Sequence, residues 1–184
     1  MKYLIVAVGA FLFSTTLACA QSLTLSQNIA VKYAEQYLSM QGFSRSALLK
    51  QLSVVSEGEY SDADAAVAVD SLHINWGQQA VIFAKQQLST QNYSPAGLIQ
   101  FLISPSDQAD GGDSGGGFSV ADATAAVDSL HINWNAQAVI TAKADFMPHT
   151  SCQDLINQLA SEGPGGGFTK SQAIYGAKQA GLCP

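Results

Sequence analysis

The sequence predicts an all-α protein built as a tandem array of three small three-helix repeats, each with a helix-turn-helix outline. The nine residues from Ala68 to Trp76 recur unchanged from Ala126 to Trp134, so one module has been copied along the chain. Around both copies, apolar residues recur at the spacing of one helix face. Outside these helices no segment alternates apolar and polar residues for long, so strands are not expected.

The copies set the boundaries of the units. Ala80 and Ala138 occupy the same position 58 residues apart, and Ala30 precedes Ala80 by 50 residues. The difference comes mainly from a glycine-rich insert at 107–117. Three units are therefore expected, at residues 28–74, 75–132 and 133–184.

The first helix of each unit is expected to carry a stripe of small apolar residues. In the second unit this stripe contains Ala80, Ala84 and Leu88. The second helix follows a turn with an aromatic residue and a hydroxyl, and Pro95 suits a first helical position. The hydroxyls expected to cap the second helices are those of Ser44, Ser94 and Ser151.

The third helix of each unit carries the clearest local signal. A hydroxyl residue is followed three positions later by an acid or an amide, which is the pattern of a capping box or a near variant of it. An aromatic residue placed to act as a hydrophobic staple precedes each box. The three sets are Tyr60 with Ser61 and Asp64, Phe118 with Ser119 and Asp122, and Phe168 with Thr169 and Gln172.

Two glycine-rich segments, 107–117 and 163–167, interrupt the helical pattern. They lack the apolar residues needed to offset ordering, so mobile loops between the second and third helices are expected. Asp107, Asp110 and Asp113 raise the alternative of a calcium site. An EF-hand loop needs a glutamate twelve residues from its first ligand, and this stretch has none there. No metal or cofactor is therefore predicted.

The first 20 residues have the organisation of a secretory signal peptide. Lys2 supplies the positive start, residues 4–17 form an apolar run, and residues 18–20 offer a small-x-small cleavage site. A buried N-terminal helix would not require this order of features. No later segment is long and apolar enough to predict a transmembrane span. The chain is therefore expected to be exported, to the cell surface or beyond it.

Cys19 leaves lipid attachment open as an alternative to free secretion. In this chain, however, Leu17 lies one place closer to the cysteine than in a normal bacterial lipobox. Soluble export is favoured over a lipid anchor on Cys19.

Cleavage after residue 20 would leave two thiols, those of Cys152 and Cys183, both in the third unit. An even number of cysteines in an exported chain predicts a disulfide. Free buried thiols are less expected outside the cytosol. A zinc site is poorer still, because His149 is the only imidazole nearby and the cysteines lack paired spacing.

The composition predicts an ordinary core and an acidic surface. Apolar residues make up 47% of the chain, which suffices for a core. Acidic residues number 14 against eight basic ones, and loss of Lys2 with the leader would lower the basic count further. This balance disfavours nucleic acid as a partner, because phosphate binding depends on clustered lysine and arginine. It also disfavours electrostatic attachment to anionic lipid.

The repeated motif brings an acid, an imidazole and an indole close together twice, as Asp70, His73 and Trp76 and as Asp128, His131 and Trp134. No nucleophile with an evident base or oxyanion donor accompanies either set. Packing is the favoured interpretation. The two tryptophans are expected to fill the gaps between units, and each histidine to close the preceding helix.

Three signatures together resemble the Ltp family. They lie at residues 43–49, at 167–176, and at the Asn-Trp segments 75–81 and 133–139. The family comprises host cell surface-exposed proteins, usually lipoproteins, of Gram-positive bacteria and their phages. The resemblance implies compact helical units on the cell surface. Its best understood members act in superinfection exclusion, blocking phage DNA entry by engaging the tape-measure protein of the incoming phage.

The predicted function is therefore that of a non-enzymatic protein-binding repeat protein, with a phage tape-measure or envelope protein as partner. One alternative is a structural or adaptor module of the cell envelope without a phage partner. A remote alternative is an exported hydrolase that uses aspartate and histidine. Polar residues beside the repeated turns are the candidate binding residues, and they are Arg45, Asp70, His73, Asp128 and His131.

Overall fold

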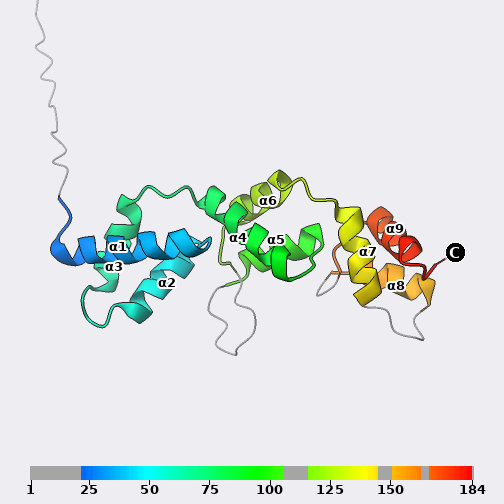
Figure 1. Ribbon diagram of the computed structural model, residues 1–184, viewed down its shortest axis with the longest axis horizontal. Helices are drawn as coiled ribbons and strands as arrows, with labels where there is room; N and C mark the ends of the chain where they lie inside the picture. Colours follow the sequence, from blue (N-terminus) through cyan, green and yellow to red (C-terminus); the bar gives the residue numbers. More distant parts are fainter. Residues whose placement is uncertain (1–21, 106–115, 145–150, 163–165, 184) are drawn as a thin grey trace, which may run out of the picture.

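The computed structural model describes residues 22–105, 116–144, 151–162 and 166–183, and every regular element in these ranges is a helix. The helices form three consecutive groups that lie in a row along the long axis of the molecule (Figure 1). The all-α repeat fold is thereby confirmed. The helices are α1 (Leu25–Met40), α2 (Arg45–Val55), α3 (Asp62–Ser71), α4 (Trp76–Thr90), α5 (Pro95–Ile103), α6 (Val120–Ser129), α7 (Trp134–Ala144), α8 (Cys152–Ala160) and α9 (Lys170–Gln179).

Each group buries its own core. The expected stripes lie inward: Ala30 and Ala34 on α1, and their counterparts on α4 and α7, are fully buried. Facing them, the second helix of each group contributes two leucines with 1% exposure or less. Full burial of a leucine side chain stabilises a fold by roughly 1.5 to 3 kcal/mol. These leucines are Leu48, Leu52, Leu98, Leu102, Leu155 and Leu159.

The predicted N-caps are present. Ser44, Ser94 and Ser151 each accept a hydrogen bond from the backbone amide three residues later. The boxes that begin at Ser61 and Thr169 are complete and reciprocal. These side chains satisfy amides that a helix leaves unpaired at its start, so the ends of the elements follow directly from the sequence.

The first helix begins before the unit boundary that the repeat spacing predicts. α1 starts at Leu25, three residues ahead of Asn28, because Thr24 and Gln27 form a complete capping box. This box belongs to the first unit alone, and spacing between copies therefore could not reveal it.

The two tryptophans each start a helix of one unit and pack on the core of the unit before it. Trp76, the first residue of α4, is half-buried against the first core, and Trp134, the first residue of α7, against the second. Ser26 occupies the matching position in the first unit.

The end of the glycine-rich insert is held by the second unit. The amides of Gly116 and Gly117 donate to the carbonyls of Phe101 and Ser104, which returns the chain to the start of α6. The rest of the insert with its aspartates, the expected signal peptide and Cys19 lie outside the described residues. Within the described ranges, no helix has the length and apolar character needed to cross a membrane.

Candidate functional site

The first unit joins the start of its second helix to the end of its third by an ion pair. Arg45, the first residue of α2, donates from Nε and Nη2 to the two carboxylate oxygens of Asp70 on α3, both at 2.8 Å. The hydrogen bond from Arg45 lowers the pKa of Asp70, and the same bond raises the pKa of Arg45. Both side chains are exposed, at 44% and 58%, so the pair contributes only about 0.2 to 1 kcal/mol.

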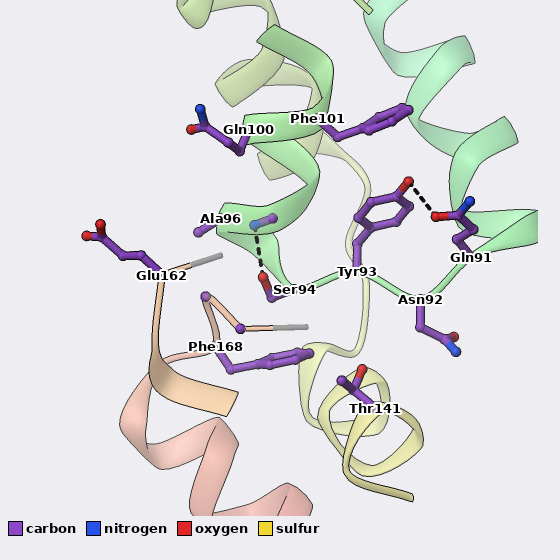
Figure 2. A pocket seen from close by; sticks show the side chains of 13 residues that line it. Gln91, Asn92, Tyr93, Ser94, Ala96, Gln100, Phe101, Thr141, Glu162 and Phe168 are labelled. Atoms are coloured by element: carbon purple, nitrogen blue, oxygen red, sulfur yellow. Dashed lines mark hydrogen bonds between the residues drawn. The ribbon is translucent and has the colours of Figure 1, made fainter. Parts of the chain in front are cut away.

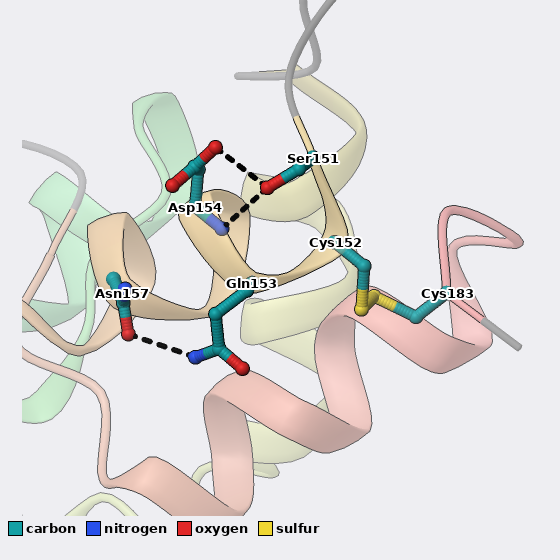
Figure 3. Close-up of a disulfide and its surroundings, with 6 residues drawn as sticks. All are labelled: Ser151, Cys152, Gln153, Asp154, Asn157 and Cys183. Atoms are coloured by element: carbon teal, nitrogen blue, oxygen red, sulfur yellow. Dashed lines mark hydrogen bonds between the residues drawn. A yellow bond between two sulfur atoms is a disulfide. The ribbon is translucent and has the colours of Figure 1, made fainter.

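The third unit has a covalent link at the corresponding place. Cys152 is the first residue of α8, and it forms the predicted disulfide with Cys183, which follows α9 (Figure 3). The Cα atoms of the two cysteines are 5.2 Å apart.

The second unit has neither link. Pro95 stands where Arg45 and Cys152 stand in the other units, and it offers no polar side chain. The carboxylate of Asp128, the counterpart of Asp70, is exposed and makes no hydrogen bond or ion pair with any described residue. The second unit therefore has neither a disulfide nor a side-chain ion pair between the start of its second helix and the end of its third.

The predicted histidines end the third helices in a strained conformation. His73 and His131 have φ values of +48° and +51°, the left-handed region that favours glycine. In the third unit the same position is Gly181, with φ of +77°. Nδ1 of His73 lies 2.7 Å from the carbonyl of Ser71, so this ring folds back onto its own helix end. Both histidines thus terminate a helix, and both are exposed.

The first and second units meet through direct hydrogen bonds. The amide of Gly42 donates to Oε1 of Gln86 at 3.1 Å, and the amide of Phe43 donates to Oε1 of Gln79 at 3.3 Å. A Cβ on Gly42 would lie 2.5 Å from two backbone atoms of α4, so this turn fits against the helix because the residue is glycine. We call this contact the first interface.

The second and third units enclose a pocket of about 930 Å³ where the equivalent turn meets α7 (Figure 2). We call this contact the second interface. Its walls are the turn and start of α5 from the second unit, Thr141 of α7, and the segment before α9. The pocket reaches solvent beside the exposed side chains of Asn92, Gln100 and Glu162.

Two buried polar atoms near this pocket have no hydrogen-bond partner. Thr141 is 7% exposed, and its hydroxyl is directed toward the turn that carries Asn92 (Figure 2). One helical turn earlier on α7, Oε1 of Gln137 is also buried and unpaired. Buried polar groups are normally satisfied, so an unpaired hydroxyl in a pocket wall indicates a place for a ligand group.

The family comparison matches the units that flank this region. The model of a family described as host cell surface-exposed lipoproteins, the Ltp family, matches residues 26–72 and 133–179. Together these stretches comprise 94 of the 184 residues, just over half of the chain. The chain belongs to the Ltp family. A search of curated proteins and a search of solved structures found no match.

Membership in the Ltp family agrees with the predicted export, since the family is described as exposed at the cell surface. The matches begin near the start of α1 and of α7 and end at the close of α3 and of α9, so one family unit equals one three-helix group. The second unit, with its glycine-rich insert and Pro95, lies between the two matches.

The structure brings together two of the candidate binding residues, Arg45 and Asp70, in the ion pair described above. Asp128 and His131 lie on the next unit and make no hydrogen bond or ion pair with the first pair. Across the described ranges no three side chains of histidine, cysteine, aspartate or glutamate gather as a metal site would require. The repeated motif is thus spread along the surface rather than gathered into one cleft.

The sequence reasoning missed the pocket at the second interface. Two of its lining residues, Asn92 and Thr141, differ from their counterparts Gly42 and Phe83, and nearby Gln86 is replaced by Ala144. A comparison of equivalent positions in the copies could have found the pocket, because a different residue at an equivalent position indicates a different contact between units. Our prediction followed the residues that the copies share.

Proposed function

We propose that this chain is a non-enzymatic, protein-binding member of the Ltp family that acts at the cell surface and interferes with the entry of phage DNA. Family membership over two of the three units is the observation that carries this proposal. The partner in this proposal is a protein of the incoming phage, with the tape-measure protein as the first candidate.

The arrangement of side chains supports binding rather than catalysis. Each core is filled by aliphatic and aromatic residues, while Asp70, His73, Asp128 and His131 lie exposed on the outer surface. Neither serine hydroxyl of the repeated motif is hydrogen bonded to a base: those of Ser71 and Ser129 each donate to a carbonyl of their own helix. The acidic balance of the chain favours a partner with basic patches, through steering of the encounter.

The two tryptophans belong to this proposal as links between the units. The indole rings of Trp76 and Trp134 each belong to one unit and pack against the core of the preceding unit. Such links would hold the exposed residues of successive units in a fixed order along one surface.

The test is expression of the chain, with its own leader, in a Gram-positive host that is then challenged with tailed phages. We expect fewer plaques with unchanged phage adsorption and reduced entry of phage DNA. A matched control is Leu98→Asp, which places a charge in the second core and should abolish protection. Saturable binding of the purified tape-measure protein of a suppressed phage would identify the partner. Unchanged plaque counts against every phage tested, with the chain displayed on the surface, would refute the proposal.

An adaptor of the cell envelope is the second candidate function. It is favoured by the first interface, where backbone groups of one unit are hydrogen bonded to side chains of the next, as suits a spacer. Binding to isolated cell wall by a chain that does not protect against any phage would support this alternative.

A further inference from the structure

The second interface has different residues at the positions whose contacts close the first interface. Gly42, which fits against α4, is replaced by Asn92, whose side chain cannot occupy the same space. Gln86 bonds to the amide of Gly42 and to the carbonyl of Met40, whereas its counterpart Ala144 can make neither bond. The contact between neighbouring units is therefore closed at the first interface and open at the second.

At the pocket, the third unit lacks an aromatic ring that the second unit has at the equivalent position. In the second unit the ring of Phe83 packs against that of Phe118, with centroids 5.7 Å apart. In the third unit Phe168 is the counterpart of Phe118, but Thr141 takes the place of Phe83. Phe168 therefore lines the pocket without the ring partner that its counterpart has.

The first interface also indicates which polar group is missing. There, Oε1 of Gln79 accepts a hydrogen bond from a backbone amide, that of Phe43. Its counterpart Gln137 has an unpaired Oε1, and the hydroxyl of Thr141 on the same face of α7 is unpaired as well. The glutamine oxygen that accepts from polypeptide backbone at the first interface therefore lacks a partner at the second, and the hydroxyl of Thr141 adds a second unpaired group there.

We propose that the pocket at the second interface binds an extended segment of a partner protein. The segment places an apolar side chain against Phe168, and its backbone forms a hydrogen bond with the hydroxyl of Thr141. This inference rests on the proposed function, because it names the part of the chain that takes hold of the protein partner. The pocket volume of about 930 Å³ can hold several side chains of such a segment.

Charge narrows the chemistry of the segment. Glu162 is the one charged residue that lines the pocket in the described part of the chain, and no lysine or arginine accompanies it. An anionic ligand would meet only negative charge there, whereas a lysine or arginine beside the apolar side chain would meet a carboxylate. The expected segment is thus basic and apolar, in agreement with the acidic balance of the whole chain.

The experiment is an NMR titration of the purified, exported chain with a capped peptide of sequence Gly-Lys-Phe-Ser-Lys-Gly. We expect shifts at the amides of Ala96, Thr141 and Phe168 and weaker binding when the phenylalanine of the peptide is replaced by serine. Thr141→Phe restores the ring of the second unit and should weaken binding at least about tenfold. The matched control is Asn135→Ala, an exposed change on the same helix, which should bind as the original chain does.

A second variant covers the case in which Thr141→Phe fails to fold. Ala96 is exposed and lines the pocket, so Ala96→Trp fills the opening without altering a core. Circular dichroism of both variants confirms that helix content is kept. Peptide binding that survives Ala96→Trp in a folded chain, or shifts confined to residues away from the pocket, would overturn the proposal. Binding of N,N′-diacetylchitobiose in place of the peptide would overturn it too, because the site would then take glycans.

Failure of this inference is distinguishable from failure of the proposed function. If Thr141→Phe loses the peptide but still suppresses phage as well as the original chain does, the pocket is not the partner site and the proposed function stands. If the original chain suppresses no phage but binds the peptide in the pocket, the proposed function fails and the peptide site stands.

Discussion

Removal of the disulfide should loosen the third unit and leave the first two folded. Replacement of Cys152 and Cys183 by serine opens a loop whose ends are 31 residues apart. Loop-closure entropy for that length predicts a loss of about 3.7 kcal/mol at 25 °C. The ion pair at the corresponding place in the first unit is exposed and contributes only about 0.2 to 1 kcal/mol. The disulfide is therefore the strongest link between a second and a third helix in the described part of the array.

Hydrogen exchange measured by mass spectrometry, unit by unit, is the assay. In the double variant, the amides of α8 and α9 should exchange faster, while those of α1 to α3 keep their original protection, since stacked repeats open separately. Arg45→Ala is the matched control, and it should alter exchange only slightly and only in the first unit. Faster exchange that begins in the first unit of the cysteine variant, or a loss below about 1 kcal/mol, would refute the reasoning.

Three further perturbations test local features. Asp70→Asn should lower stability by about 0.5 kcal/mol near neutral pH. Because the hydrogen bond from Arg45 lowers the folded pKa of Asp70, its contribution is present above the unfolded pKa and is lost as the pH falls below about 4, so urea melts of variant and original should converge there. Asp128→Asn, which breaks no ion pair, should leave the stability near neutral pH unchanged. His73→Gly should stabilise the first unit by roughly 0.5 to 1 kcal/mol, because glycine removes the strain of the left-handed backbone. Gly181→Ala should destabilise the third unit by a similar amount. If urea melts show that His73→Gly destabilises the chain, the imidazole contributes more to stability than the strain costs. Gly42→Ala should separate the first and second units, because the added Cβ would lie too close to the backbone of α4. X-ray scattering should then give a larger radius of gyration at unchanged helix content. Unchanged scattering would show that the interface adapts to the added methyl group.

The sequence predicted the fold because its local signals agree with one another. The hydroxyls of Ser44 and Ser61 mark helix starts, the alanine stripes mark inward faces, and the repeated nonapeptide marks the period. Each of these signals acts within a few residues, so each can be read without knowledge of the tertiary structure. The disulfide was predictable for a different reason, since the expected cleavage of the leader would leave two cysteines, both in the same unit.

The site was harder to predict because it depends on contacts between units. The pairing of Arg45 with Asp70 joins residues 25 apart, and nothing local indicates that the start of α2 meets the end of α3. The left-handed backbone of the histidines is also concealed, because glycine appears at that position only in the third unit. The pocket arises from differences between copies, whereas a repeat is recognised from what the copies share.

Photo-crosslinking at two matched positions tests the central claim most directly. Ala96 lines the pocket at the second interface, and Ser46, its counterpart in the first unit, lies in the closed interface, where its hydroxyl donates to the carbonyl of Gly117. Benzoylphenylalanine is introduced at one position or the other, and the chain is irradiated with the biotinylated lysine-phenylalanine peptide. We expect an adduct from position 96 and none from position 46. Equal labelling at both positions, or none at position 96, would contradict the account.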